Sequence, residues 1–267
     1  MHFTGVGMDL QLTGKLALVT GASRGIGLAA ARALTEEGAT VVGAARTMTP
    51  ELVSTGAHGV VADLAQPDGP EALVRTVEAE HGDIDILVNN AGGGDSVDLR
   101  AAADYEDRIW QQTFDLNFFA TVRACRAAMP GLLRRRGVVV NISSIGARMP
   151  HSGPAPYTTA KAALNAFGKA LAEEYGDRGV RVVTVSPGPT RTALWTDPQG
   201  FGGTMAAAQG ITHEELLAGL ATASGIRSGR LVEPEHVASL VAYLASPLAA
   251  SVTGQDYLVD GGALKTA

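Results

Sequence analysis

The sequence has 267 residues, of which 46% are hydrophobic and 18% charged, and its formal net charge is −6. This composition is typical of a globular protein, and without a long basic run it argues against nucleic acid as a partner. A single cysteine, Cys125, excludes an internal disulfide and no apolar run reaches the ~20 residues that cross a bilayer, so we expect a cytoplasmic protein that binds no membrane.

Residues 1–8 lack the basic stretch and apolar core of a signal peptide, so we expect a short extension before one domain over 9–267. From there, short apolar runs typical of strands alternate with longer stretches of helical periodicity. The predicted strands are 15–20, 40–45, 58–63, 84–90, 138–143, 180–186 and 255–262, and the predicted helices are 25–37, 68–81, 103–134, 156–176 and 233–246. This alternation predicts a doubly wound α/β domain, in which a parallel sheet has helices on both faces and right-handed crossovers.

The segment 190–231 interrupts the pattern. It is rich in Gly, Pro and Ala, its helical signals are short, and we expect it to be the least ordered part of the domain. A long segment of this kind in a compact domain is usually functional, so a substrate lid is favoured over a simple surface excursion.

A glycine-rich loop, TGASRGIG, spans residues 20–27 between the first strand and the first helix. Its glycines, Gly21, Gly25 and Gly27, are spaced differently from those of the familiar GxGxxG fingerprint. Glycines at this place let the backbone approach a pyrophosphate, whose charge is favoured by the helix N-terminus. The loop therefore predicts a dinucleotide site.

The end of the second strand bears on which dinucleotide binds. An acidic residue there would bind the ribose of NAD, whereas an arginine suits the 2′-phosphate of NADP. The chain has Ala45 followed by Arg46, and Arg24 lies in the glycine loop. Two guanidinium groups could converge on one phosphate, so NADP(H) is predicted; the alternative is that both arginines are solvated surface residues.

Tyr157 and Lys161 are four residues apart within a predicted helix, so they share one face of it. Such a pair is common on amphipathic helices. By itself it predicts little about chemistry.

Taken together, several separated motifs resemble the short-chain dehydrogenase/reductase family, in its Asn-Ser-Tyr-Lys branch. They are TGASRGIG, NNAG at 89–92, Asn117, Ser144, YTTAK at 157–161 and SPGPTRT at 186–192. The resemblance runs from about residue 10 to 262 and implies a Rossmann-type, seven-stranded parallel sheet that binds a nicotinamide dinucleotide. The cofactor residues that it implies, with the two arginines, are Gly21, Ser23, Arg24, Gly25, Ile26, Gly27, Arg46, Asp63, Leu64, Asn90, Ala91, Gly92, Tyr157, Lys161, Pro187, Gly188, Thr190 and Thr192.

The resemblance also gives the Tyr-Lys pair a role. Tyr157 would be the acid and base that exchanges a proton with the substrate oxygen, and Lys161 would lower its pKa from ~10 towards the working range. Ser144, 13 residues before Tyr157, would hold the substrate oxygen; its neighbour Ser143 is the rival. Asn117 would hold a water that links Lys161 to solvent, or would be purely structural.

Six histidines show no pairing of a metal-binding kind, so no metal is predicted. We expect NADP(H)-dependent reduction of a carbonyl on an apolar small molecule, with alcohol oxidation and NADPH sensing without turnover as alternatives. The family pattern places Gly93, Gly94, the 145–155 loop with Met149 and His151, Leu194, Trp195, Phe201 and Met205 on the pocket walls. It also implies a homodimer or homotetramer packed through 103–134, 156–176 and the final strand.

Overall fold

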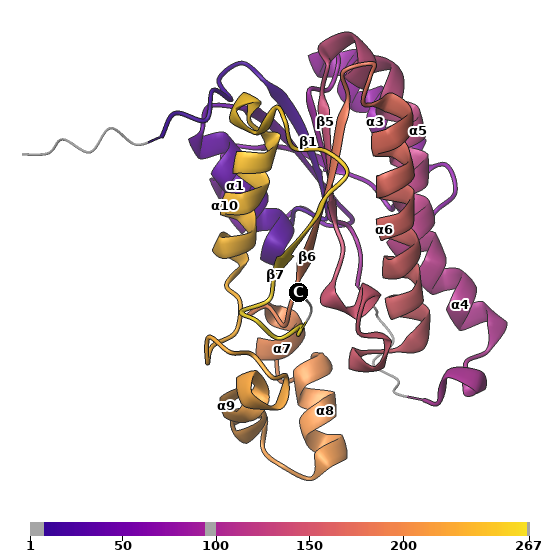
Figure 1. Ribbon diagram of the computed structural model, residues 1–267, viewed down its shortest axis with the longest axis vertical. Helices are drawn as coiled ribbons and strands as arrows, with labels where there is room; N and C mark the ends of the chain where they lie inside the picture. Colours follow the sequence, from indigo (N-terminus) through magenta and orange to yellow (C-terminus); the bar gives the residue numbers. More distant parts are fainter. Residues whose placement is uncertain (1–7, 94–99, 266–267) are drawn as a thin grey trace, which may run out of the picture.

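The centre of the molecule is one parallel sheet of seven strands in the order β3-β2-β1-β4-β5-β6-β7 (Figure 1). The computed structural model describes residues 8–93 and 100–265. The strands are β1 Leu16–Thr20, β2 Thr40–Ala45, β3 His58–Val61, β4 Ile86–Asn89, β5 Val138–Ile142, β6 Arg181–Pro187 and β7 Asp256–Val259. All neighbouring strands pair in parallel, so the predicted fold class is confirmed.

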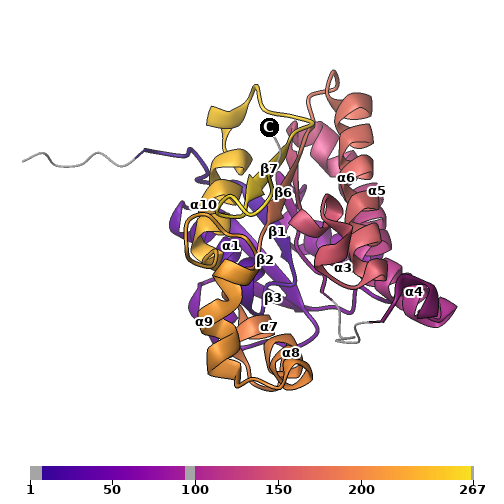
Figure 2. The same ribbon diagram turned by 60° about the horizontal axis from the view of Figure 1, so that its bottom comes forward.

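Helices cover both faces of this sheet (Figure 1, Figure 2). α1 and α10 lie on one face, and α3, α5 and α6 on the other. The helices are α1 Gly25–Glu36, α2 Pro50–Ser54, α3 Gly69–His81, α4 Asp107–Phe114, α5 Ala120–Arg135, α6 Ala155–Tyr175, α7 Ala193–Thr196, α8 Phe201–Gln209, α9 His213–Ala223 and α10 Pro234–Ala245. Among the described residues, no helix combines the length and the apolar character needed to span a membrane.

Successive strand residues serve two separate cores. Ala17 and Val19 of β1 pack with the α1 and α10 face, whereas Leu16 and Leu18 pack with the α3, α5 and α6 face. Side chains alternate between the faces of a strand, so a strand covered on both sides must be apolar throughout. This is why the strands appear in the sequence as unbroken apolar runs.

Strand order reverses between β1 and β4, because the chain winds outwards from β1 in both directions. In open α/β sheets, ligands bind at this switch point, beyond the carboxyl ends of the strands. Thr20, Asn89, Ile142 and Pro187 end β1, β4, β5 and β6. The motifs that directly follow these residues therefore meet at one edge of the sheet.

The helical region predicted over 103–134 is divided by a change of winding. A π-helical turn, Asp115–Phe119, joins α4 to α5, and a short 3-10 turn, Ala102–Asp104, precedes α4. Single π turns inside α-helices are often found at functional sites. This one contains Asn117.

The segment 190–231, which the sequence predicts to be the least ordered part, folds into short helices rather than one irregular loop. It contains α7, α8 and α9, which lie together beyond one end of the sheet (Figure 1, Figure 2). A capping box begins α9, where Thr212 and Glu215 bond each other's backbone N–H groups. Because two glycines in α8 and one in α9 dilute the periodic pattern, the helices are harder to recognise than the capping residues.

Candidate active site

The glycine loop after β1 has a backbone that requires glycine. Gly21 and Gly25 have φ of +66° and +58°, in the left-handed region that glycine occupies without strain. At Gly27, a Cβ would overlap the carbonyl oxygen of Gly21 and the side-chain amide of Asn90. The loop and the start of α1 are therefore packed closely against Asn90, and only glycine fits at these positions.

The loop is joined to the end of β4 by hydrogen bonds. The Asn90 side-chain amide donates to the carbonyl oxygens of Thr20 and Gly21 at 2.9 and 3.1 Å. The Thr20 hydroxyl accepts from the backbone N–H groups of Asn90 and Ala91, both at 3.0 Å. Thr20 was not among the predicted site residues, although a hydroxyl at the last position of the strand before a glycine loop is a signal that could have indicated it.

The N-terminus of α1 suits an anionic group. Arg24 occupies the N-cap position and makes no side-chain cap, so the first backbone N–H groups of the helix lack this partner. These groups and the helix dipole favour negative charge. Arg24 in the loop and Arg46 after β2 are both exposed, while Ser23 and Ile26 are half-buried.

The predicted adenine-side residues follow β3. The Asp63 carboxylate accepts from the Ala65 backbone N–H at 3.1 Å, and Leu64 is buried. Asp63 thus has a local role in shaping the turn, and any contact to a cofactor stays a prediction.

The segment after β6 approaches the glycine loop from the opposite side. A Cβ on Gly25 would lie 3.1 Å from the Thr192 methyl group, and the Thr190 hydroxyl donates to the Gly188 carbonyl at 2.9 Å. Gly188 itself packs against Asp260, whose Cα would lie 2.9 Å from an added Cβ. Pro187, Gly188, Thr190 and Thr192 therefore lie where the resemblance implies a cofactor contact.

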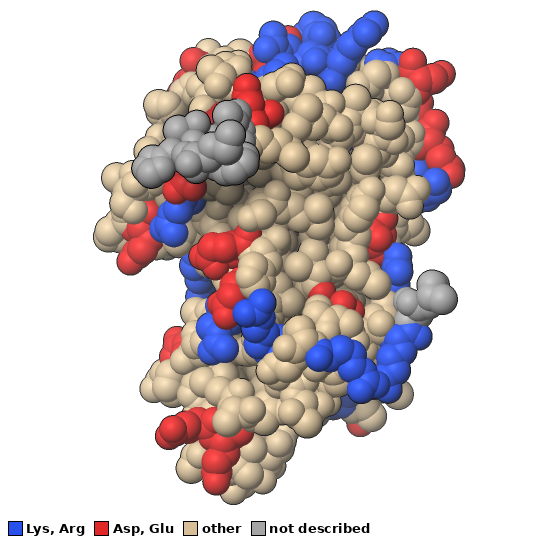
Figure 3. Space-filling view, turned by 60° about the vertical axis from the view of Figure 1, so that its left-hand side comes forward, with Lys and Arg blue, Asp and Glu red and all other residues tan. Residues whose placement is uncertain are grey.

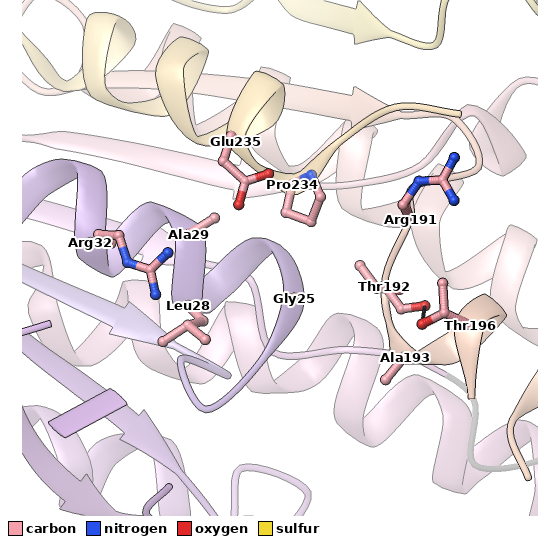
Figure 4. A pocket seen from close by; sticks show the side chains of 10 residues that line it. All are labelled: Gly25, Leu28, Ala29, Arg32, Arg191, Thr192, Ala193, Thr196, Pro234 and Glu235. Atoms are coloured by element: carbon pink, nitrogen blue, oxygen red, sulfur yellow. Dashed lines mark hydrogen bonds between the residues drawn. The ribbon is translucent and has the colours of Figure 1, made fainter. Parts of the chain in front are cut away.

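A cavity of about 380 Å³ lies between α1, the start of α7 and the start of α10 (Figure 4). The residues around it are Gly25, Leu28, Ala29, Arg32, Arg191, Thr192, Ala193, Thr196, Pro234 and Glu235. The cavity borders the glycine loop through Gly25 and Thr192. Tyr157 and Ser144 are not among the residues that line it.

Tyr157 and Lys161 lie on α6 as predicted. Lys161 is only 4% exposed; its ammonium group donates to the Ile142 carbonyl at 2.9 Å and lies 5.8 Å from the centre of the Tyr157 ring. Burial lowers the pKa of Lys161 to about 8. The lysine is therefore held beside the phenol, at the end of β5.

The predicted direction of the Tyr157 pKa is wrong for the chain alone. Burial raises the pKa of Tyr157, and the hydrogen bond with Ser144 opposes that shift only in part. Desolvation disfavours the ionised phenol here more strongly than its neighbours favour it. Burial thus opposes the lowering of the Tyr157 pKa that the resemblance implies.

The two serines after β5 face different ways. The Ser143 hydroxyl donates to the Lys161 carbonyl at 3.3 Å and is buried, so it ties β5 to α6. Ser144 begins a 3-10 turn, Ile145–Ala147; its hydroxyl accepts from the Gly146 N–H at 3.0 Å, and its side chain acts to lower the pKa of Tyr157. Of the two, Ser144 has the geometry of a group that shares a substrate oxygen with Tyr157.

Asn117 is buried and its side chain is well bonded. Its carbonyl oxygen accepts from the Gly93 N–H at 2.9 Å, and its amide donates to the carbonyls of Gly93 and Thr113, each at 3.0 Å. A Cβ on Gly92 would lie 2.9 Å from the Asn117 oxygen and 3.1 Å from the Lys161 nitrogen. Asn117 thus shapes the 90–93 loop beside Lys161, and the predicted water relay stays a prediction.

The predicted pocket walls are partly brought together. Met149 and Trp195 pack against a small apolar cluster that contains Ile145, next to Ser144. Trp195 also contacts Phe201 edge to face, with ring centres 5.1 Å apart, and its carbonyl bonds His213. His151 and Leu194 are exposed, Met205 and Gly93 are half-buried, and Gly94 lies outside the described residues.

The fold and the residues gathered at its carboxyl edge define an oxidoreductase of the dinucleotide-binding α/β class. The family model for enoyl-(acyl carrier protein) reductase matches residues 21–263. The 3-oxoacyl-(acyl-carrier-protein) reductase FabG of Vibrio cholerae is 35% identical over 260 residues, which are 95% of this chain and 98% of that protein. The chain belongs to the short-chain dehydrogenase/reductase family, as its motifs predicted.

Solved structures agree with this assignment. L-Sorbose reductase from Gluconobacter frateurii, complexed with NADPH and L-sorbose, superimposes with a TM-score of 0.88 at 34% identity, covering 97% of this chain and all of that one (100%). A variant of the actinorhodin polyketide ketoreductase with NADPH gives a TM-score of 0.85 at 34% identity, covering 94% and 98% of the two chains.

Proposed function

We propose that this chain reduces the carbonyl group of an apolar small molecule to an alcohol, with NADPH as the reductant. The observation that carries the proposal is the meeting of Ser144, Tyr157 and Lys161 beside the glycine loop. FabG and the polyketide ketoreductase support the reaction class, because both are named as reductases of oxo or keto groups.

A bound NADPH would supply the hydride that the substrate carbon receives. This chain's part is to hold the substrate oxygen and to supply its proton. The Ser144 hydroxyl donates a hydrogen bond to that oxygen, and Tyr157 gives it the phenolic proton as negative charge grows there. Lys161, when protonated, stabilises the phenolate that is left.

The same residues serve alcohol oxidation in reverse. Direction depends on the ratio of oxidised to reduced cofactor, which the chain does not set. In the oxidative direction, Tyr157 would accept the proton of the alcohol.

The preference for NADP(H) rests on the two exposed arginines near the ends of β1 and β2, Arg24 and Arg46. Position 45 is an alanine, so no carboxylate there repels a phosphate. The NADPH bound in L-sorbose reductase and in the polyketide ketoreductase supports the same choice. The residues fit the group, since two exposed guanidinium groups offer positive charge and the N-terminus of α1 favours an anion.

Cofactor choice has a direct test. Arg46→Glu should weaken NADPH binding by about 10- to 100-fold, because a hydrogen bond to a charged group contributes ~1.5–3 kcal/mol, and it should spare NADH. Fluorescence titration with both cofactors measures this. An equal loss for NADPH and NADH would remove Arg46 from the 2′-phosphate site.

The reaction itself is tested by following NADPH absorbance with a panel of carbonyl compounds. The panel should contain 3-oxoacyl thioesters, cyclic and aromatic ketones and a ketose, since the similar proteins named above act on such different substrates. We expect turnover of an apolar ketone. NADPH binding without consumption by any member would instead support the sensing alternative.

We also propose that the chain forms a homodimer or homotetramer through α4, α5, α6 and β7. A run of half-buried aromatic side chains supports it: Trp110, Phe114, Phe118 and Phe119 are in ring contact along α4 and the π-helical turn, and Phe118 contacts Phe167 of α6. Symmetric assembly is the common rule for such chains. Sedimentation of the purified chain distinguishes monomer, dimer and tetramer.

The remaining assignments are proposals of the same kind. Residues 9–267 form one domain in which 190–231 acts as a substrate lid, and residues 1–7 of the expected extension lie outside the described residues. The single cysteine and the dependence on NADPH support a cytoplasmic location.

A further inference from the structure

Asp256, the first residue of β7, lies outside every motif considered so far. Its side chain is 13% exposed, and its carboxylate meets three partners. It accepts from the Ser186 hydroxyl at 2.7 Å and from the Asn165 side-chain amide at 2.8 Å, and it forms an ion pair with Arg148 at 3.0 Å. One carboxylate thus joins β6, α6 and the turn after β5 to the last strand of the sheet.

Each partner is close to a residue of the proposed site, along the chain or along a helix. Asn165 is one helical turn beyond Lys161, on the same face of α6. Ser186 directly precedes Pro187 at the end of β6, and Arg148 directly follows the 3-10 turn Ile145–Ala147 that begins at Ser144.

Hydrogen bonds within the turn connect Ser144 to Arg148. The Ala147 N–H donates to the Ser144 carbonyl at 3.1 Å, and the Arg148 N–H donates to the Ile145 carbonyl at 2.9 Å. The Ser144 hydroxyl accepts from the Gly146 N–H at 3.0 Å. A displacement of Arg148 must therefore move or break the turn that presents Ser144.

Packing alone does not hold this turn on the side of β7. A cavity of about 420 Å³ lies there, with Arg148, Asn165, Gly168, Thr184 and Asp256 among its lining residues. On the opposite side, the turn meets α6 through Thr158, whose methyl group would lie 3.0 Å from a Cβ on Gly146. The ion pair between Arg148 and Asp256 joins the turn to β7 across this cavity, and both of its groups are charged.

Asn165 depends on the same carboxylate. Its amide nitrogen donates to Asp256, while its buried carbonyl oxygen has no hydrogen-bond partner among the described residues. The orientation of this side chain is thus set from one end only. Loss of the carboxylate would release both Asn165 and Arg148.

We propose that Asp256 is a positioning residue for the reaction: through Arg148 and Asn165 it fixes the turn that carries Ser144 against α6, so that the Ser144 hydroxyl meets Tyr157. This rests on the proposed carbonyl reduction for its catalytic consequence, but not for the structural tie itself. Asp256 does not touch the reacting atoms and acts only on the placement of Ser144.

The test compares Asp256→Asn and Arg148→Met with a matched control, Lys169→Met. Lys169 lines the same cavity and pairs with Glu173 at 3.3 Å, but it is not bonded to the turn. For the first two variants we expect kcat for an accepted ketone to fall about 10-fold, since displacements of ~1 Å at a reacting centre cost up to about 100-fold, while the Kd for NADPH changes less than about twofold. The double variant should be no worse than Asp256→Asn alone, because that variant already removes the ion pair that Arg148→Met removes. Arg148→Lys, which keeps the charge, should recover part of the loss, and Lys169→Met should leave kcat unchanged.

A second measurement does not depend on turnover. Hydrogen exchange of the amides of residues 146–149 should speed up in Asp256→Asn and Arg148→Met at unchanged melting temperature, and not in Lys169→Met. Unchanged exchange in both variants would overturn the positioning role, whether or not a substrate is known. Faster exchange with unchanged kcat would overturn its catalytic consequence. If the unmodified chain reduces no carbonyl compound, the proposed function fails, and the exchange data still decide whether Asp256 holds the turn.

Discussion

The carboxyl edge of the sheet and the lid segment 190–231 are built in different ways. At the edge, Lys161 and Asn117 are almost completely buried, and their side chains are hydrogen-bonded to backbone groups. In the lid, Leu194 and Ile211 are 46% and 39% exposed, and α7 and α8 are short. We propose that the two regions divide their tasks, so that the edge performs the chemistry and the segment 190–231 selects the substrate that reaches it.

Charge on the molecular surface follows no comparable division. On the face shown in Figure 3, lysines and arginines are interspersed with aspartates and glutamates around large neutral areas. Mixed surfaces of this kind do not steer a strongly charged polymer. We therefore expect the substrate to be selected by the shape and apolar character of the lid, and not by long-range electrostatic attraction to the surface.

The largest effect should come from the edge. Tyr157→Phe removes the proposed proton donor and keeps the ring, so we expect kcat for ketone reduction to fall by about 10³-fold or more, with the Kd for NADPH nearly unchanged. Steady-state kinetics and fluorescence titration measure the two quantities. Retention of more than about a tenth of kcat would show that another group gives the proton.

Replacing a glycine by alanine should weaken NADPH binding strongly at the edge but not in the lid. Gly27→Ala places a methyl group on the Gly21 carbonyl and the Asn90 amide, so we expect about a 100-fold weaker Kd for NADPH as the loop is displaced. The matched control is Gly219→Ala in α9, where an added Cβ meets nothing within 4 Å. There we expect unchanged binding and a slightly higher melting temperature, since alanine favours a helix over glycine by ~1 kcal/mol. Equal effects at both positions would contradict the difference between the regions.

The pH dependence of kcat/KM should also originate at the carboxyl edge of the sheet. With the pKa of Lys161 lowered to about 8 and that of Tyr157 raised, kcat/KM for reduction should fall about 10-fold for each pH unit above 8, because Lys161 loses its charge while Tyr157 keeps its proton. The folding stability should change with pH in the opposite direction to kcat/KM. Since the lysine pKa is lower in the folded chain than its usual 10.5, folding stability should rise with pH between about 8 and 10.5.

These two trends distinguish a titration from simple unfolding. A pH series of kcat/KM and of melting temperature, repeated with Lys161→Arg, measures both. The arginine stays charged and should lose the inflection near pH 8. An inflection that persists in this variant would assign the titration to a different group.

The smallest effect is expected from the lid. Trp195→Ala removes a side chain that packs near Ile145 and contacts Phe201, so we expect about a 5-fold higher KM for apolar ketones with kcat changed less than about twofold. Michaelis–Menten kinetics with one apolar ketone measure this. A fall in kcat as large as that of the edge variants would mean that the lid takes part in the chemical step.

The two regions also differ in how far the sequence predicts them. The edge follows from motifs, because Gly21, Gly27 and the strand ends are dictated by backbone geometry that only certain residues allow. The direction of the Tyr157 pKa could not be predicted, since it depends on burial, which neither the spacing to Lys161 nor the motif expresses. Nor could the role of Asp256, because its partners Arg148, Asn165 and Ser186 are brought together only by the register of β6 and β7 and the packing of α6.

In the lid, the sequence pattern indicates helices only weakly, although helices form. The helices α7, α8 and α9 form although glycine lowers helix propensity, because Trp195, Leu216 and Leu220 bury apolar surface against residues distant in sequence. The short α2, Pro50–Ser54, was missed for a similar reason, since it depends on the cap formed by Thr49 and on the burial of Leu52.

The division between edge and lid is tested most directly by the order in which the carbonyl panel is accepted, measured as kcat/KM for Ser144→Ala and Trp195→Ala beside the unmodified chain. We predict that Ser144→Ala lowers every value by a similar factor and keeps the order, whereas Trp195→Ala changes the order. A reordering by Ser144→Ala, or a uniform loss in Trp195→Ala, would contradict the account.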